Sequence, residues 1–524
     1  MTDICLLFEV HQPLRLNRNF HLDLLTSRPS ISKNDLFELY FDNTLNRQIF
    51  DRVARKCYFP ANAIILEEIK RFKEEEKQFK VAYGISGVFI EQCIRWNPSL
   101  LESFKQLGQT GCVEFLGETY YHSLASLYDI NRVEFVEQVK MHRELIRSVF
   151  DYKPMVFENT ECLFNNAIAK TIANMGYKAI ITEGVDRILR WRSPNYVYKV
   201  KDSSLPVLLR NYQLSDDIGF RFTARDWNGW PLTASKYASW LAGTHGHSIL
   251  LFIDYETLGE HHWPESGIHD FLRWLPGEVL KWNHLYWRTP SEVVNLHLPV
   301  GEIDVNEYAT ISWADLERDA SAWISNPMQR VSYELLKGLE PLVKGLGDEN
   351  WLRLWRYFQM SDHLYYMSVK GGGSGDVHSY FNPSGNSIDA FVSFSNIISD
   401  FEARILQELQ KPHLAAKWIL RRLPTGQGFT FFQDFAQPTC FKVNDMFQFV
   451  VAIKKAPIQS IDYHMERGDF ERWLSQVLGD DELAKAVAVL YRQRLAGETL
   501  RENLINVVDA RLSKLEVIAG KEKV

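Results

Sequence analysis

Short apolar runs alternate with amphipathic stretches along the first 300 residues of the chain. Apolar runs of about four to eight residues are typical of strands buried on both faces, as in a parallel sheet. They predict strands at 3–9, 79–85, 112–116, 154–157, 178–182, 206–210, 249–253 and, as an eighth candidate, 291–293. Helical periodicity predicts helices at 43–56, 61–77, 87–95, 132–149, 164–175, 233–243 and 265–281. This alternation favours a closed α/β barrel of seven or eight strands. An open doubly wound sheet is the alternative, although no glycine-rich nucleotide-binding motif follows any predicted strand.

Four of the predicted strands run directly into ionisable or amide side chains. The polar residues at these four ends are His11 and Gln12, then Glu118 and His122, then Glu158 and Glu161, and finally Asp254, Glu256, Glu260, His261 and His262. In an α/β barrel the carboxyl ends of the parallel strands meet at one face, and catalytic groups project there. We therefore expect these side chains to line a single cleft.

Beyond residue 300 the pattern changes, and three regions are predicted. Residues 1–300 are expected to form the barrel, residues 301–422 a helical subdomain, and residues 423–524 a C-terminal extension. In that extension FTFFQDF and FQFVVAI read as strands, and helices follow after Asp469. The glycine-rich segment KGGGSGDVHSYFNPSGN, which begins at Lys370, is expected to be a lid or a plain linker.

Composition narrows the class of protein. The chain has 524 residues, of which 46% are hydrophobic and 24% charged, as in an ordinary globular protein. A net charge of −7 argues against a nucleic-acid partner. No apolar run approaches the roughly 20 residues that span a bilayer, so no membrane partner is expected. The start, MTDICLLFEVHQP, lacks a basic segment, and the six cysteines are scattered singly, which favours a cytoplasmic protein without a secretory signal.

Carboxylates dominate the predicted cleft, which makes paired acid–base chemistry the first candidate. A retaining glycosidase uses two carboxyl groups about 5–5.5 Å apart, one as nucleophile and one as general acid/base. Glu161 and Asp254 follow two different strands and suit this division. Spacing alone leaves Glu158 as a competitor of Glu161, and Glu256 as a competitor of Asp254. Aromatic residues, 13% of the chain, could supply flat platforms for sugar rings.

Two other classes of protein remain open at this stage. His245 and His247, in GTHGHS, could bind a metal together with Asp254 or His261, as in a metal-dependent deacetylase or mannosidase. A chelator would abolish activity in that case. The other class is a glucan-binding protein without catalysis, in which replacing Glu161 by Gln would change nothing measurable.

Five segments of the chain resemble, in order, the five sequence regions of glycoside hydrolase family 57. They are HQP at 11–13, VEFLGETYYHS at 113–123, FENTE at 157–161, DYETLGEHHW at 254–263 and SDHLYYM at 361–367. The resemblance spans residues 1 to about 400 and is greatest to the short, cytosolic, α-amylase-type members. It implies a seven-stranded (β/α)7 barrel, a variant of the TIM barrel, followed by a mainly helical C-terminal region. The helical subdomain at 301–422 would close the cleft.

The resemblance also implies roles for individual residues. Glu161 is expected to be the nucleophile and Asp254 the general acid/base of a double displacement on α-1,4-linked glucans, without metal or cofactor. The residues expected to bind substrate are His11, Gln12, Glu118, His122, Glu256, His261, Trp263 and Asp362. A 4-α-glucanotransferase or an α-glucan branching enzyme with the same catalytic pair is the alternative, because the acceptor decides between hydrolysis and transfer. The sequence leaves the oligomeric state open.

Overall fold

The computed structural model describes residues 1–20, 32, 35–73, 77–128, 131–370, 382–424 and 426–520. The chain divides into two compact units. The first unit consists of Met1–Lys337 and Arg356–Ile397, and the second of Gly338–Trp355 and Ile398–Val524. The predicted boundaries at 300 and 422 therefore fall inside units rather than between them. Most of the glycine-rich segment that begins at Lys370 lies outside the described residues.

The first unit is built on parallel strands that coincide with the first seven predicted runs. They are β1 (Thr2–Val10), β2 (Val81–Ile85), β3 (Val113–Phe115), β4 (Val156–Glu158), β5 (Ala179–Glu183), β7 (Pro206–Arg210) and β8 (Ser248–Asp254). β1 pairs with both β2 and β8, β2 pairs with β3, and the path continues through β4, β5 and β7 to β8. A parallel bridge between Gly117 and Phe157 joins the end of β3 to β4. The series of strand pairings thus starts at β1 and returns to β1, so the parallel strands form a closed ring.

Three short strands extend this sheet and were not predicted. They are β6 (Tyr198–Val200), which is antiparallel to β7, β9 (Leu285–Trp287), which pairs with the first residues of β1, and β10 (Glu302–Ile303), which pairs with β6. The predicted strand at 291–293 is wrong, because these residues belong to helix α13 (Pro290–Leu296). Thr289 and Glu292 form a capping box there and Pro290 occupies the first turn, and these signals outweigh the β-branched valines.

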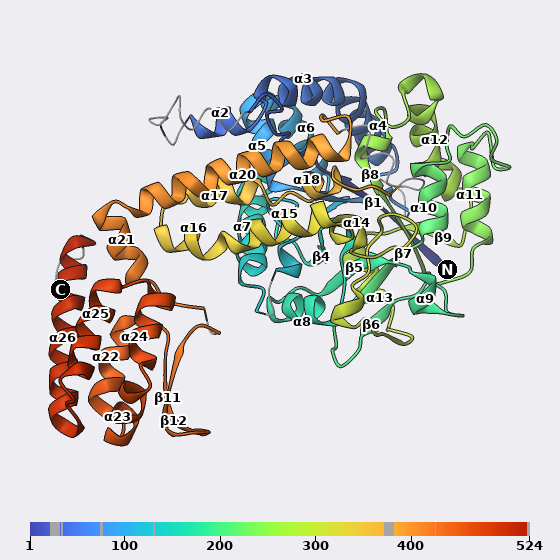
Figure 1. Ribbon diagram of the computed structural model, residues 1–524. Helices are drawn as coiled ribbons and strands as arrows, with labels where there is room; N and C mark the ends of the chain where they lie inside the picture. Colours follow the sequence, from blue (N-terminus) through green and yellow to red (C-terminus); the bar gives the residue numbers. More distant parts are fainter. Residues whose placement is uncertain are drawn as a thin grey trace. The chain divides into compact units, whose positions relative to one another are not determined.

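Helices lie between the strands and cover the sheet (Figure 1). The helices of this unit that precede residue 290 are α2 (Leu36–Tyr40), α3 (Asn43–Val53), α4 (Phe59–Arg71), α5 (Gly87–Trp96), α6 (Pro98–Gly108), α7 (Val133–Phe150), α8 (Asn166–Asn174), α9 (Asp186–Leu189), α10 (Tyr212–Gly219), α11 (Ala234–Gly243) and α12 (Ile268–Leu280). Several begin where a side chain accepts a hydrogen bond from the first turn, as Asp42, Ser86 and Asn165 do. Others, such as α4, α7 and α12, form without a side-chain cap, so apolar periodicity alone is sufficient there.

The strands bury side chains on both faces. In β1, Ile4, Leu6 and Phe8 pack into the layer between sheet and helices, whereas Cys5 and Leu7 pack into a separate cluster with residues of β4, β5 and β8. Because alternate residues of a strand share a face, Glu9 lies on the same side as Cys5 and Leu7. The alternation therefore places the carboxylate of Glu9 on the same buried face of the sheet as Cys5 and Leu7.

Residues after 300 in the first unit are mainly helical. They include α14 (Ser321–Ile324), α15 (Pro327–Gly338), α18 (Ser361–Tyr365) and the first part of α20 (Ser387–Leu409). The second unit contains α16 (Glu340–Leu346), most of α17 (Glu349–Tyr357), the rest of α20, α21 (Pro412–Ile419), the hairpin β11 (Phe429–Asp434) and β12 (Gln437–Val443), and then α22 (Met446–Lys455), α23 (Ile458–Glu466), α24 (Asp469–Trp473), α25 (Asp481–Arg492) and α26 (Gly497–Ile518).

FTFFQDF is a strand as predicted, but FQFVVAI is not. It forms most of α22, where Asp445 accepts a hydrogen bond from the backbone of Gln448 and starts the helix. Phe449, Val450 and Ile453 share the buried face of that helix, so tertiary packing outweighs their strand propensity. None of the described helices combines the length and the apolar character needed to cross a bilayer.

Candidate active site

The polar strand ends of the first unit converge on one cavity. Its lining residues are Glu9, His11, Gln12, Pro13, Arg15, His122, Glu161, Asp254, Glu256, His261, Trp313 and Asp362. They come from the carboxyl ends of β1 and β8, from the loops after β3 and β4, and from two segments beyond residue 300. The expectation that the polar strand ends share one cleft is therefore met for most of these residues.

The backbone at Glu161 has an unusual conformation. Glu161 and Cys162 have φ angles of +59° and +54°, in the left-handed region that side-chain-bearing residues rarely adopt. Each residue in this conformation costs about 1–3 kcal/mol of folding free energy and persists only where its surroundings hold it in place. Here the Ser312 hydroxyl donates to the carbonyl oxygen of Glu161 at 2.8 Å, and the Thr182 hydroxyl donates to that of Cys162 at 2.9 Å. The surrounding segments thus fix the direction in which Glu161 points.

The Glu161 carboxylate has a donor at each oxygen. The Ser361 hydroxyl donates to Oε1 at 2.9 Å and the Trp313 indole N–H donates to Oε2 at 2.7 Å. Nε2 of His122 lies 3.5 Å from Oε1. Charge-assisted hydrogen bonds of this kind are strongest to an ionised carboxylate, the form that a nucleophile requires.

Asp254 and Glu256 follow each other on β8 and in the short turn after it, but their environments differ. Asp254 is in register with Glu9 of β1 and is partly exposed at the cavity. Glu256 is buried and accepts a hydrogen bond from the Tyr58 hydroxyl. Burial, together with the negative charge of Asp254, raises the pKa of Glu256 to about 8. Both carboxyl groups line the cavity, and Asp254 is the more exposed of the two.

The raised pKa of Glu256 should make the protein less stable as the pH rises from 4.5 to 8. In this range the folded protein keeps a proton that the unfolded chain has released, so the free energy of unfolding falls with increasing pH. At about 1.4 kcal/mol per pKa unit the loss is on the order of 5 kcal/mol. Glu256→Gln should therefore raise the thermal midpoint relative to wild type at pH 8 but not at pH 5, measured by circular dichroism.

The exposed Glu144 provides the control for this comparison, because Glu144→Gln should shift the midpoint by less than about 1 °C at either pH. An equal loss of stability at pH 5 and pH 8 in Glu256→Gln would instead mean that the folded protein needs the ionised carboxylate.

Two stacked imidazoles form one wall of the cavity. The rings of His11 and His122 lie 4.1 Å apart at an angle of 18°. His11 contacts the Ser86 hydroxyl through Nδ1 at 2.7 Å and the Asp362 carboxylate through Nε2 at 3.1 Å. Burial and the neighbouring His122 lower the pKa of His11. Burial also opposes the charged form of His122, but the carboxylates of Glu118 and Glu161 more than offset this and raise its pKa well above 6.5.

Comparison with known proteins agrees with this geometry. The profile of the family described as Glycosyl hydrolase family 57 matches residues 5–306, more than half of the chain. The chain belongs to glycosyl hydrolase family 57. A Methanocaldococcus jannaschii protein, whose name gives alpha-amylase as a provisional activity, is 48% identical over 412 residues, which are 77% of this chain and 85% of that protein.

Two solved structures are similar in fold. A family 57 branching enzyme from Thermococcus kodakaraensis is 12% identical, with a TM-score of 0.51 and coverage of 78% of this chain and 94% of the enzyme. An exo-type maltose-forming amylase from Pyrococcus sp. ST04 is also 12% identical, with a TM-score of 0.51 and coverage of 99% and 95%. At these identities the likeness concerns the fold alone.

Two of the substrate-binding residues predicted for this family 57 chain do not line the cavity. Glu118 is fully buried behind His122, where a sugar hydroxyl cannot reach it. Trp263 is 54% exposed and carries the ammonium group of Lys56 over its ring at 4.3 Å. Glu118 and Trp263 thus stay predictions that the cavity lining does not support, because adjacency in a motif does not decide on which side of a turn a side chain lies. The remaining six, His11, Gln12, His122, Glu256, His261 and Asp362, line the cavity.

The structure also distinguishes Glu161 from Glu158, its competitor for the role of nucleophile. Glu158 is fully buried and is not among the cavity-lining residues, whereas Glu161 is.

His245 and His247 precede β8, at the opposite end of the strand from Asp254. A strand rises about 3.3 Å per residue, so these histidines cannot share a metal ion with Asp254 or His261. The metal set suggested by GTHGHS is thus excluded.

Five contributors to the family 57 site were not predicted as site residues. Four line the cavity, namely Glu9, Pro13, Arg15 and Trp313, and the fifth, Ser361, donates a hydrogen bond to Glu161. Glu9 left a signal in the sequence, because a carboxylate inside the apolar run ICLLFEV is costly to bury without a special role. Trp313 and Ser361 lie far from Glu161 in sequence, and only the tertiary fold brings them to it.

Proposed function

We propose that this family 57 protein is a retaining enzyme that cleaves α-1,4-linked glucans, with Glu161 as nucleophile and Asp254 as general acid/base. One observation carries the assignment of roles. Glu161 and Asp254 end two different strands at the same cavity, one held by two donors and the other partly open to the cavity. These different environments support different roles for the two carboxyl groups.

The chemistry proceeds in two displacements. The Glu161 carboxylate attacks the anomeric carbon while Asp254 donates its proton to the leaving oxygen, which gives a glycosyl ester on Glu161 and frees the shortened glucan. Asp254, now ionised, removes a proton from water as the water oxygen attacks the anomeric carbon. Glu161 leaves as a carboxylate, and Asp254 regains its proton. His11, His122 and Asp362 are placed to contact the sugar hydroxyls during both steps.

The ring of parallel pairings supports a seven-stranded barrel, with β9 as a short addition beside β1. We also infer that the helical region after residue 300 closes the cleft. Trp313, Ser361 and Asp362 all come from this region and all contact the site. An acceptor sugar would have to enter past the same segments, so they would also govern the choice between hydrolysis and transfer.

Product analysis tests the proposed function. The purified protein is incubated with amylose and with maltoheptaose, beside Glu161→Gln and EDTA-treated samples. Shorter oligosaccharides with new reducing ends from the wild type, and none from Glu161→Gln, are expected for an amylase. Longer and shorter products without a net gain of reducing ends would indicate a glucanotransferase, and new α-1,6 linkages a branching enzyme. No product from either substrate would refute an α-glucan-active enzyme.

A further inference from the structure

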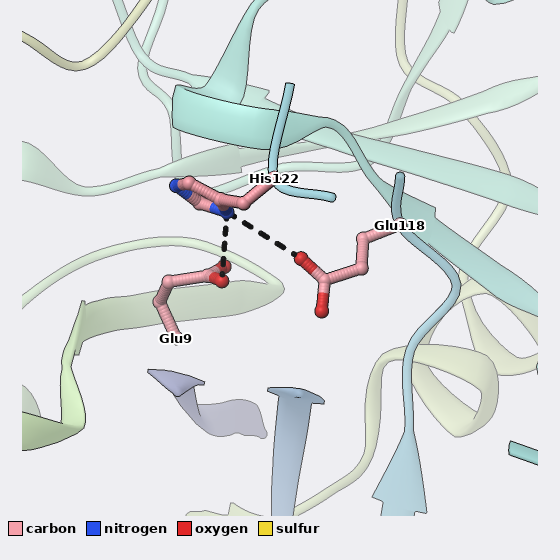
Figure 2. A group of neighbouring side chains, drawn as sticks. All are labelled: Glu9, Glu118 and His122. Carbon is pink, nitrogen blue, oxygen red and sulfur yellow. Dashed lines mark ion pairs between the residues drawn. The ribbon is translucent and has the colours of Figure 1, made fainter. Parts of the chain in front are cut away.

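A cluster of buried ionisable groups lies directly behind the cavity. Glu9, Glu118 and His122 each offer one ligand atom, and these atoms lie within 4.8 Å of one another. Figure 2 shows the His122 ring with Nδ1 turned toward both carboxylates, at 3.5 Å from Glu9 Oε1 and 3.7 Å from Glu118 Oε2. The three residues come from the end of β1 and from the loop after β3. All three are at most 4% exposed.

The carboxylates in this cluster lack the partners that buried charges require. In the described part of the chain, no donor lies in good hydrogen-bonding geometry to the oxygens of Glu9, Glu118 and the neighbouring Glu158, and Nδ1 of His122 also lacks such a partner. Burial and the neighbouring carboxyl groups raise the pKa of Glu9 well above its usual range and that of Glu158 to about 8. A buried carboxylate without such partners is strongly destabilising. One imidazolium at His122 would balance one negative charge, whereas a divalent cation would balance two.

The adjacent His142 does not neutralise Glu118. Its Nδ1 accepts a hydrogen bond from the backbone N–H of Glu118 at 3.2 Å, and its Nε2 lies 2.9 Å from the carbonyl oxygen of Ile85. An acceptor at one nitrogen and a donor at the other define a neutral imidazole. Burial accordingly lowers the pKa of His142. The charge of Glu118 thus remains to be balanced from the side of His122.

Gly84 in strand β2 has no side chain, and this leaves room for the carboxylates of Glu9 and Glu158. A Cβ atom on Gly84 would lie 3.2 Å from Oε2 of Glu9 and 3.5 Å from Oε2 of Glu158. A glycine inside a strand weakens it and often marks a place where another group approaches the backbone closely. A glycine at position 84 therefore allows the carboxylates of the cluster to lie against the backbone of β2.

We propose that Glu9, Glu118 and His122 bind a divalent transition-metal ion, with Zn²⁺ as the preferred occupant. Two carboxylate oxygens and an imidazole nitrogen are a ligand set that suits Zn²⁺. In a tetrahedral zinc site with ligands about 2.0–2.1 Å from the metal, the ligand atoms lie about 3.4 Å apart. The two distances from His122 Nδ1, 3.5 Å to Glu9 and 3.7 Å to Glu118, are close to this value, and the ligand atoms of the two carboxylates lie within 4.8 Å of each other. Ca²⁺ and Mg²⁺ prefer oxygen ligands throughout.

A metal ion at this place would act on the proposed nucleophile through His122. With Nδ1 bound to the metal, the imidazole carries its proton on Nε2, which lies 3.5 Å from Oε1 of Glu161. His122 would then be a positioning residue that presents a donor to Glu161. This consequence rests on the proposed function, whereas metal binding itself does not.

The test measures metal directly. The full-length protein is stripped with a chelator, dialysed, and incubated with Zn²⁺, and bound zinc is determined by elemental analysis after removal of free metal. We expect about one zinc per chain and a rise in the thermal midpoint of at least about 3 °C. Glu118→Gln should lose at least about nine-tenths of the bound zinc and the thermal shift.

Glu114→Gln is the matched control. Glu114 is also a buried carboxyl on β3, but it accepts a hydrogen bond from the backbone of Ser291 and lies outside the cluster. This variant should bind zinc as wild type does. If Glu118→Gln fails to fold, Glu9→Gln replaces it, and the wild-type measurement needs no variant.

Less than about one-tenth of an equivalent of zinc, with no thermal shift, would overturn the proposal, and so would unchanged zinc binding in Glu118→Gln. Bound protons, and not a metal ion, would then neutralise the negative charge of the carboxylates in the cluster. Since zinc content is read without substrate, a failure here is distinguishable from a failure of the proposed α-glucan activity.

Discussion

Glu161→Gln should reduce the turnover of maltoheptaose by about 10⁴-fold or more. The amide cannot form the glycosyl ester, so the double displacement stops at its first step. Gln keeps the shape of the side chain and can still accept a hydrogen bond from Trp313 or Ser361. Substrate binding should therefore persist, and reducing-end release and calorimetric binding to maltoheptaose, measured on the same preparation, separate the two effects.

Glu114→Gln provides the comparison for this result as well. It removes one buried carboxyl from the neighbouring strand β3 without touching the cavity, and its turnover should stay within about threefold of wild type. Turnover of Glu161→Gln within tenfold of wild type would rule out Glu161 as the nucleophile. Glu158→Gln would then be the next variant to measure, although Glu158 lies behind the cavity surface.

Asp254→Asn should lower turnover by about 10²–10⁴-fold with glucan substrates, because general acid catalysis typically contributes that much. The loss should be much smaller with a maltoside whose activated aryl leaving group departs without protonation. Azide should restore part of the activity and give a glycosyl azide, since the anion needs no base to attack the glycosyl ester. The measurement is the rate with each substrate, with and without azide.

Glu256→Gln tests whether Asp254 or its neighbour acts as the acid. Glu256 is buried and hydrogen-bonded by Tyr58, so this variant should show neither a leaving-group dependence nor rescue by azide. Azide rescue of Glu256→Gln, without rescue of Asp254→Asn, would transfer the acid/base role to Glu256.

The strands of the first unit could be predicted because they are continuous apolar runs that need no distant partner to be recognised. β1 and β8 are the best examples, since both are buried along nearly their whole length. The short strands β6, β9 and β10 carry too few residues for a pattern. The errors at 291–293 and in FQFVVAI share one cause, because in both segments a helix cap decides the structure and the β-branched residues suggest a strand.

The candidate site was most readily predicted at the ends of strands. Asp254 is the last residue of β8, His11 directly follows β1, and Glu161 lies three residues after β4, and all three line the cavity. Glu118 also follows a strand, but its turn directs the side chain behind His122. Direction within a turn depends on single φ angles, such as the +48° of His122, which residue types do not specify.

The division of the chain into two interleaved units has a consequence for its synthesis. Domains generally fold one after another as the ribosome releases them. Here the segment Gly338–Trp355 leaves the ribosome before Arg356–Ile397 completes the first unit, and it must wait for Ile398–Val524 to find its own partners. Neither unit can be completed by a nascent chain shorter than about 400 residues. Truncation after the family-matched residues 5–306 would leave the growing protein without Ser361 and Asp362, so the site is assembled only late in translation.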